Sequence, residues 1–132
     1  MTSADQYNIY QPIHGDGPGP AVMGANTLIG DHIHNAQDEH LGQLKEIMLD
    51  TKSGEIAYAV LSRGGVFTLG EKLYAVPWSA LHLNTEKKNL VLNVDKERFD
   101  TAPGFDPNNW PDMADLAWRN NLDTYYGVNQ SR

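Results

Sequence analysis

Three closely spaced histidines are the side chains of this chain with the clearest capacity for chemistry. His32 and His34 stand two residues apart, so in a strand both project from the same face, and His40 follows after a polar turn. Three imidazoles could bind a transition metal ion, because ring nitrogen is a good ligand for such metals. The spacing places no carboxylate beside the rings to orient them. We therefore interpret the cluster as a solvated histidine face and predict no metal, with these three residues as the candidate ligands.

Other residues that could do chemistry lack the sequence context that the chemistry needs. Glu55 and Glu71 could act as paired carboxylates, but nothing in the sequence makes them converge. The glycines between residues 64 and 70 precede a predicted strand, whereas a phosphate-binding loop leads into a helix. Residues 50–55 place Lys52 where a calcium loop needs an oxygen ligand. We expect no catalytic residue, no cofactor and no enzyme activity.

Aromatic residues are the other resource of the chain. Trp78 and Trp110 are expected to pack against the ends of a barrel or to hold a C-terminal helix, whereas Trp118, Tyr125 and Tyr126 come late in the chain. Tyrosine and tryptophan are enriched at the centres of protein interfaces. We name all five as candidate interaction residues.

Composition excludes several classes of function. The 132 residues include 17 acidic and 10 basic side chains, for a formal net charge of -7, which disfavours a nucleic-acid-binding surface. The chain has no cysteine, so disulfides and zinc-thiolate sites are excluded. The N-terminus has no signal-peptide pattern, and no apolar run is long enough for a membrane helix. We expect a soluble, cytoplasmic protein that binds no nucleic acid and does not insert into a membrane.

The elements that must position these residues are mainly strands. Apolar patterning predicts strands over residues 28–35, 41–49, 55–62, 73–76 and 90–94. The odd-numbered step between the apolar residues of the second strand predicts a β-bulge near residues 45 and 46. The fold class is therefore all-β, as a small barrel of five to six antiparallel strands with short C-terminal helices.

Two short helices are expected after the last strand. Asp95 is a candidate N-cap for the first, and residues 109–112 are expected to start the second, whose apolar stripe is Met113, Leu116 and Ala117. The resulting organisation is a flexible leader over residues 1–25, one domain over residues 26–122 and a tail over residues 123–132.

Five sequence motifs carry a resemblance to a known family. They are LGQLKEIMLD (residues 41–50), GEIAYAVL (54–61), GEKLYAVPW (70–78), APGF (102–105) and NWPD (109–112). In this order and spacing they resemble the PRC-barrel family, which includes the cytoplasmic domain of the photosynthetic reaction centre H subunit. Because no transmembrane helix is expected ahead of the barrel, the chain is more similar to the stand-alone bacterial members.

The resemblance and the absence of a catalytic constellation point to a binding role. We expect a non-enzymatic module for protein–protein interaction and self-association, as a homodimer with a further, unknown protein partner. Two alternatives remain open. One, implied by the resemblance, is a peripheral subunit of a membrane electron-transfer complex similar to the reaction centre H subunit. The other is a metal- or ligand-binding domain that uses the His32 and His34 face.

Overall fold

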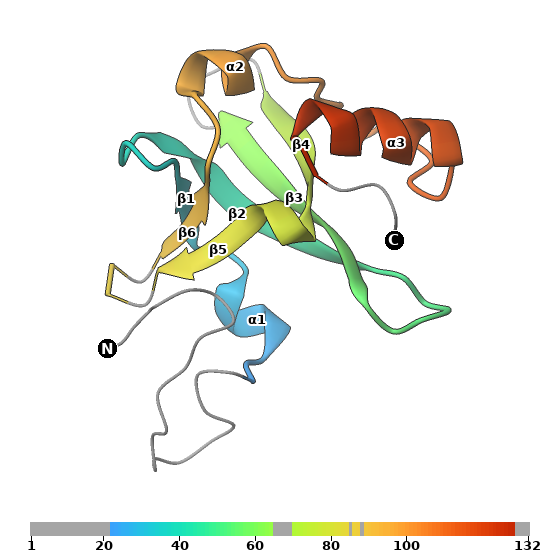
Figure 1. The fold of residues 1–132 in the computed structure, drawn as a ribbon, viewed down its shortest axis with the longest axis horizontal. Coiled ribbons are helices and arrows are strands. Elements are labelled where there is room, and N and C mark those ends of the chain that lie inside the picture. The colour runs from blue at the N-terminus through green and yellow to red at the C-terminus, as the bar shows by residue number, and fades with distance from the viewer. Residues whose placement is uncertain (1–21, 65–69, 85, 88, 129–132) are drawn as a thin grey trace.

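A computed structural model describes residues 22–64, 70–84, 86–87 and 89–128 of the chain. Its elements, in chain order, are α1 (Ala25–Leu28), β1 (His32–His34), β2 (His40–Leu49), β3 (Ile56–Gly64), β4 (Glu71–Pro77), the 3-10 turn η1 (Trp78–Ala80), β5 (Leu81–Asn84), β6 (Asn89–Leu92), α2 (Lys96–Asp100) and α3 (Leu116–Tyr125). The described part is mainly β with short helices, which confirms the predicted fold class (Figure 1).

The six strands form one sheet in the order β4-β3-β2-β1-β6-β5. Neighbouring strands are antiparallel except β1 and β6, which run parallel, so the sheet is mixed and the expectation of antiparallel strands throughout is corrected. This parallel pairing follows from the connection between β4 and β5, which is the 3-10 turn η1 and not a hairpin. These strands are the opposite edges of an open sheet, yet only three residues connect them. The sheet must therefore curl strongly, which makes it barrel-like without closing it.

The first expected strand is shorter than its sequence pattern. Leu28 ends helix α1, and Gly30 then turns the chain with a φ of 97° before β1 begins at His32. The bulge expected in β2 is confirmed, because its register with β3 shifts between Leu44 and Glu46. Strand β1 therefore has only three residues, and it lies in the middle of the sheet between β2 and β6.

Two hydrophobic clusters lie on the two faces of β3. The main one fills the concave side of the sheet and includes Ile33, Leu61, Leu90 and Phe99, all fully buried. The second is built around Tyr58, Ala75 and Leu122, where α3 covers the other side of β3 and β4 (Figure 1). Strand β3 is thus covered on both faces, as expected from its two apolar sides.

The C-terminal helices differ from their expected bounds. Helix α2 follows Asp95 as predicted, although the Asp95 side chain makes no capping hydrogen bond. Helix α3 begins at Leu116 and not at residues 109–112, because the Asp112 carboxylate accepts a hydrogen bond from the Ala114 N–H at 3.0 Å and forms a turn there.

The buried face of α3 also differs from the predicted stripe. Leu122 and Asp123 are buried, whereas Leu116 is 67% exposed and Ala117 is exposed. Met113 precedes the helix and is half-buried. The expected boundary between residues 122 and 123 therefore falls inside α3, and the one between residues 25 and 26 falls inside α1.

Candidate functional site

The three histidines meet on the outer face of the sheet, where β1 and β2 begin their hairpin. His34 lies directly opposite His40, and His32 lies one step further along β1. The ring centres of His32 and His40 are 5.0 Å apart, and those of His34 and His40 are 5.3 Å apart. His32 Nδ1 and His40 Nε2 form a hydrogen bond of 2.9 Å, so the two rings share one proton. Sequence reasoning therefore identified a group of residues that the fold brings together.

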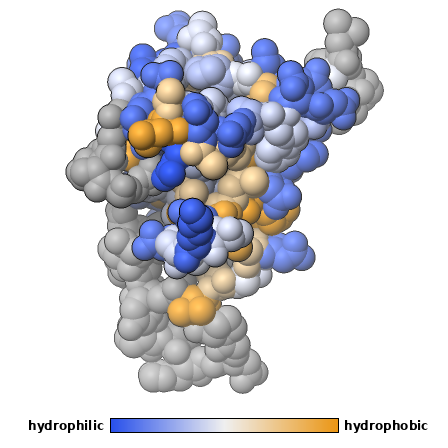
Figure 2. Space-filling model, turned by 90° about the vertical axis from the view of Figure 1, so that its right-hand side faces the viewer, coloured by the Kyte–Doolittle hydropathy of each residue, from blue (hydrophilic) through white to orange (hydrophobic). Residues whose placement is uncertain are grey.

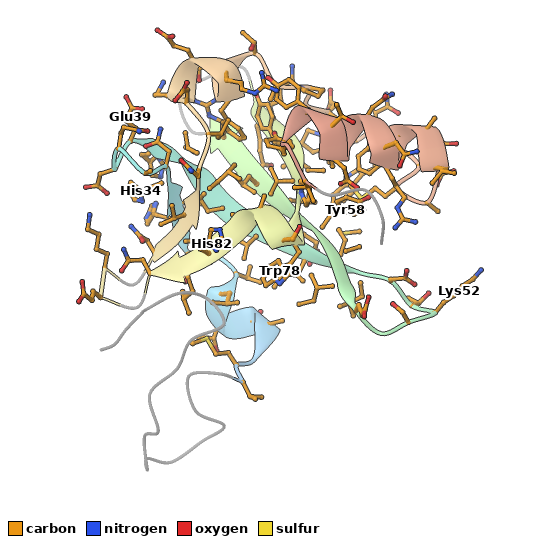
Figure 3. The ribbon with its side chains drawn as sticks, viewed as in Figure 1. His34, Glu39, Lys52, Tyr58, Trp78 and His82 are labelled. Carbon is orange, nitrogen blue, oxygen red and sulfur yellow. The ribbon has the colours of Figure 1, made fainter. Side chains whose placement is uncertain are left out.

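The surroundings of this histidine cluster favour the neutral form of His40. Partial burial, and then the nearby His32, His34 and Arg63, hold the pKa of His40 below its ordinary value. His34 Nδ1 contacts the side-chain amide of Asn89, a buried residue on β6, at 3.1 Å. Figure 3 shows His34 on this side of the molecule, near Glu39 of the adjoining turn.

The hydrogen-bonded rings of His32 and His40 are not a preformed three-ligand metal site. In the described part of the chain, no group of three His, Cys, Asp or Glu side chains is arranged as it stands to hold a metal ion. Glu39 does not join the histidine cluster, because its carboxylate accepts a hydrogen bond from Asn35 Nδ2 at 2.8 Å.

The two candidate catalytic carboxylates are not brought together. Glu55 precedes the first residue of β3, whereas Glu71 lies opposite Gly64 at the other end of that strand. Glu71 binds Lys45 at 2.9 Å and accepts a hydrogen bond from the Ser62 hydroxyl at 2.5 Å. The Ser62 hydrogen bond, and then Lys45, hold the pKa of Glu71 below its ordinary value. This carboxylate is a stabilised anion and is poorly suited to act as a general base.

Two loops were considered as ligand sites, the turn over residues 50–55 and the glycine loop over residues 64–70. The Asp50 carboxylate accepts hydrogen bonds from the N–H groups of Lys52 and Ser53, so it organises the hairpin turn. Gly54 completes that turn with a φ of 81°, a value that glycine adopts without strain. Residues 65–69 of the glycine loop lie outside the described residues.

The tryptophans occupy three different environments. Trp78 is half-buried against the main cluster, and Trp118 is half-buried with its ring edge-on to Tyr58 at 5.3 Å. Trp110 is 40% exposed, packs on Phe105 and donates its indole N–H to the Pro107 carbonyl, so it lies at the surface.

Tyr125 and Tyr126 line a cleft of about 840 Å³ between the end of α3 and the β5–β6 side of the sheet. Arg98 spans this cleft's wall, with its guanidinium 4.2 Å from the Tyr125 ring centre and a 2.5 Å hydrogen bond to the Tyr125 carbonyl. The Tyr125 hydroxyl donates back to the Arg98 carbonyl at 2.6 Å. Burial raises the pKa of Tyr126 well above its usual range. These contacts fasten α3 to α2.

Two exposed apolar residues, Leu49 and Leu116, are the feature that sequence reasoning missed. Leu49, at the end of β2, is 60% exposed, and Leu116, at the start of α3, is 67% exposed. We refer to these two residues and Trp110 as the hairpin–helix face, after the β2–β3 hairpin and the start of α3. Figure 2 shows hydrophobic side chains running across this side of the molecule around a hydrophilic projection.

The described residues contain no helix that is both long enough and apolar enough to cross a membrane.

Comparison with known proteins places the domain in a family. The model of the PRC-barrel domain matches residues 20–99, which is more than half of the chain. A search of the curated proteins found no match. The matched region ends within α2. Helix α3, which contacts Tyr58 through Trp118, therefore lies outside the matched region. The family match is consistent with the curled, open β-sheet of the structure. The chain therefore belongs to the PRC-barrel domain family.

Proposed function

We propose that this PRC-barrel protein is a non-enzymatic interaction module that self-associates through its hairpin–helix face. The observation that carries the proposal is the exposure of the large apolar side chains of Leu49, Trp110 and Leu116. Large apolar side chains in contact with water cost free energy, and burying them against a partner recovers it.

A second copy of the chain is the partner that this face fits best. Opposite charges lie close together beside the apolar residues: Asp50 and Lys52 at the hairpin tip, and Asp115 and Arg119 at the start of α3. A two-fold interface repeats each contact with the roles exchanged, so mixed charge on one face can pair with itself. The net charge of -7 opposes association of two copies through most other surfaces, since like charges repel.

The absence of enzyme activity is supported by what the polar groups do. Ser62 and Lys45 both donate hydrogen bonds to Glu71, and Glu55 is at the far end of β3. The histidine cluster has no carboxylate hydrogen-bonded to it within the described residues. General acid–base catalysis needs a positioned proton donor and acceptor around a substrate, and these residues do not provide that arrangement.

Self-association is tested by sedimentation over a wide range of protein concentrations. We expect the mass of the natural protein to rise toward that of a dimer, and Leu116→Glu and Leu49→Glu to shift it toward the monomer, because each places a charge in the apolar interface. Val22→Glu is the matched control, since Val22 is 63% exposed but precedes α1. A monomer mass for the natural protein at every concentration contradicts the proposal, as does equal weakening by Val22→Glu.

The role implied by the reaction-centre resemblance is tested separately. A peripheral subunit of a membrane electron-transfer complex is expected to sediment with membranes and to co-purify with that complex. A cytoplasmic self-associating module is expected in the soluble fraction, with the same mass as the purified protein.

A further inference from the structure

We propose that His32, His34 and His40 form a binding site for one divalent transition metal ion, with zinc as the best match. This site lies on the outer face of β1 and β2 and does not depend on the hairpin–helix face.

The fold presents the three rings to solvent from one surface. Ile33 and Leu41 are fully buried beneath the sheet, so the residues that alternate with them point outward. His34 and His40 are direct cross-strand neighbours, and His32 is the diagonal neighbour of His40. Two histidines from one strand and a third from its neighbour can contribute three imidazoles to a single ion, with a water molecule as the fourth ligand.

The spacing of His40 from the other two rings fits tetrahedral coordination. A zinc–nitrogen bond of about 2.0–2.1 Å places an imidazole centre about 3.2 Å from the ion, so two rings at the tetrahedral angle have centres about 5.2 Å apart. The observed separations are 5.0 Å for His32 and His40 and 5.3 Å for His34 and His40. His40 is therefore at the right distance from both of the other rings.

The nitrogen positions need only a small adjustment. Two nitrogens on one tetrahedral zinc ion lie about 3.3 Å apart, whereas His32 Nδ1 and His40 Nε2 are 2.9 Å apart around a shared proton. A metal ion would displace that proton and separate the nitrogens by a few tenths of an ångström. The His34 ring would turn its Nε2 toward the same point, which completes the three-donor set that the metal-free arrangement lacks.

Asn89 provides the outer contact that a ligating histidine needs. A metal-bound ring usually donates its second N–H to a nearby oxygen, which holds the ring in place. The Asn89 amide lies 3.1 Å from His34 Nδ1, and its buried Oδ1 has no hydrogen-bond partner among the described residues. With the amide turned so that Oδ1 faces the ring, Oδ1 accepts from Nδ1–H and leaves the lone pair of His34 Nε2 for the ion.

The electrostatic surroundings also suit a cation. Asp31 precedes the cluster and interacts with His32. The nearby positive charge of Arg63 is paired with Asp100 at 2.8 Å, which reduces its repulsion of an ion.

The test is titration of the full-length, tag-free chain with Zn²⁺ by calorimetry and with Co²⁺ by visible absorption. We expect one ion per chain and the intense absorption bands of tetrahedral cobalt. His32→Ala, His34→Ala and His40→Ala should each weaken binding at least about tenfold, since each removes one of three protein ligands.

His82→Ala is the matched control. His82 is exposed on β5 and lies opposite Val91, which separates it from His34 by one strand (Figure 3). Binding in this variant should equal that of the natural protein. No saturable binding, octahedral cobalt spectra, or equal weakening by His82→Ala and the three cluster variants would each overturn the proposal. Repeating the titration on Leu116→Glu separates this site from self-association, since metal binding should persist there.

Discussion

Asn35 shows how one buried polar side chain builds the histidine cluster. Its Oδ1 accepts hydrogen bonds from the N–H groups of Gln37 at 3.0 Å and Glu39 at 2.9 Å. Its Nδ2 donates to the Glu39 carboxylate and, at 3.2 Å, to the Val94 carbonyl beyond β6. The turn that returns the chain from His34 to His40 is thus folded around this amide and tied to β6. Asn35 is 2% exposed, so its lost bonds could not be replaced by water without opening the turn.

Asn35→Ala should therefore lower the free energy of unfolding by about 2–4 kcal/mol, because it leaves two backbone donors of the turn without their acceptor. Urea denaturation followed by circular dichroism measures this change. Gln37→Ala, in the same turn but exposed, should change the free energy of unfolding by less than about 0.5 kcal/mol. Equal effects of the two substitutions would mean that the Asn35 amide does not hold the turn.

Helix α3 shows what an element adds beyond the matched barrel region. The Asp115 carboxylate accepts a hydrogen bond from the Trp118 N–H at 3.0 Å and starts the helix. The helix then places Trp118 and Leu122 over Tyr58, and Arg119 Nε donates to the Tyr58 hydroxyl at 3.1 Å. Arg98 holds the other end through the Tyr125 carbonyl, where a positive charge is favourable for a helix.

Asp115→Ala should destabilise the protein by about 1 kcal/mol, as expected for the loss of an N-cap side chain. Asp95→Ala provides a matched comparison, because Asp95 occupies the N-cap of α2 without a side-chain hydrogen bond. Its effect on the melting temperature should be clearly smaller. A larger shift for Asp95→Ala than for Asp115→Ala would contradict the capping assignment.

At the scale of the whole molecule, stability depends on carboxylates that the folded state keeps charged. Hydrogen bonds from Ser62 and Lys45 lower the pKa of Glu71, and Arg63 lowers that of Asp100. Backbone N–H groups of the hairpin turn lower the pKa of Asp50. Burial raises the pKa of Asp31, which acts in the opposite direction but in one group only. The folded protein therefore binds fewer protons than the unfolded chain at acidic pH.

The contribution of these carboxylates to the free energy of unfolding should be fully present above a pH of about 4.5 and should fall as pH drops through their lowered folded-state pKa values, because the unfolded chain takes up protons first. Urea denaturation at a series of pH values measures this dependence. Glu71→Gln, which cannot titrate, should make the dependence shallower. An unchanged slope in that variant would show that the Glu71 contacts with Ser62 and Lys45 do not stabilise the fold.

Local sequence determined the parts of this protein that depend on neighbouring residues. The alternation of apolar residues set the strands, the odd step in β2 set its bulge, and Asp50 with Gly54 set the hairpin turn. The pair of histidines in β1 shares a face for the same reason, since side chains in a strand alternate. Helix α3 was misplaced because a hydrogen bond within the Asp112 turn competes with helix formation.

Only the tertiary structure decided the features that depend on residues far apart in the chain. The parallel pairing of β1 with β6 follows from how η1 carries the chain to the opposite edge of a curled sheet. That pairing brings Asn89 to His34, a contact across 55 residues of sequence. Likewise, Leu116 is exposed because α3 buries Leu122 and Asp123 instead. The sequence was enough to identify the three histidines as a possible group. Their separations and their contacts with other residues were set by long-range packing, which no local pattern encodes.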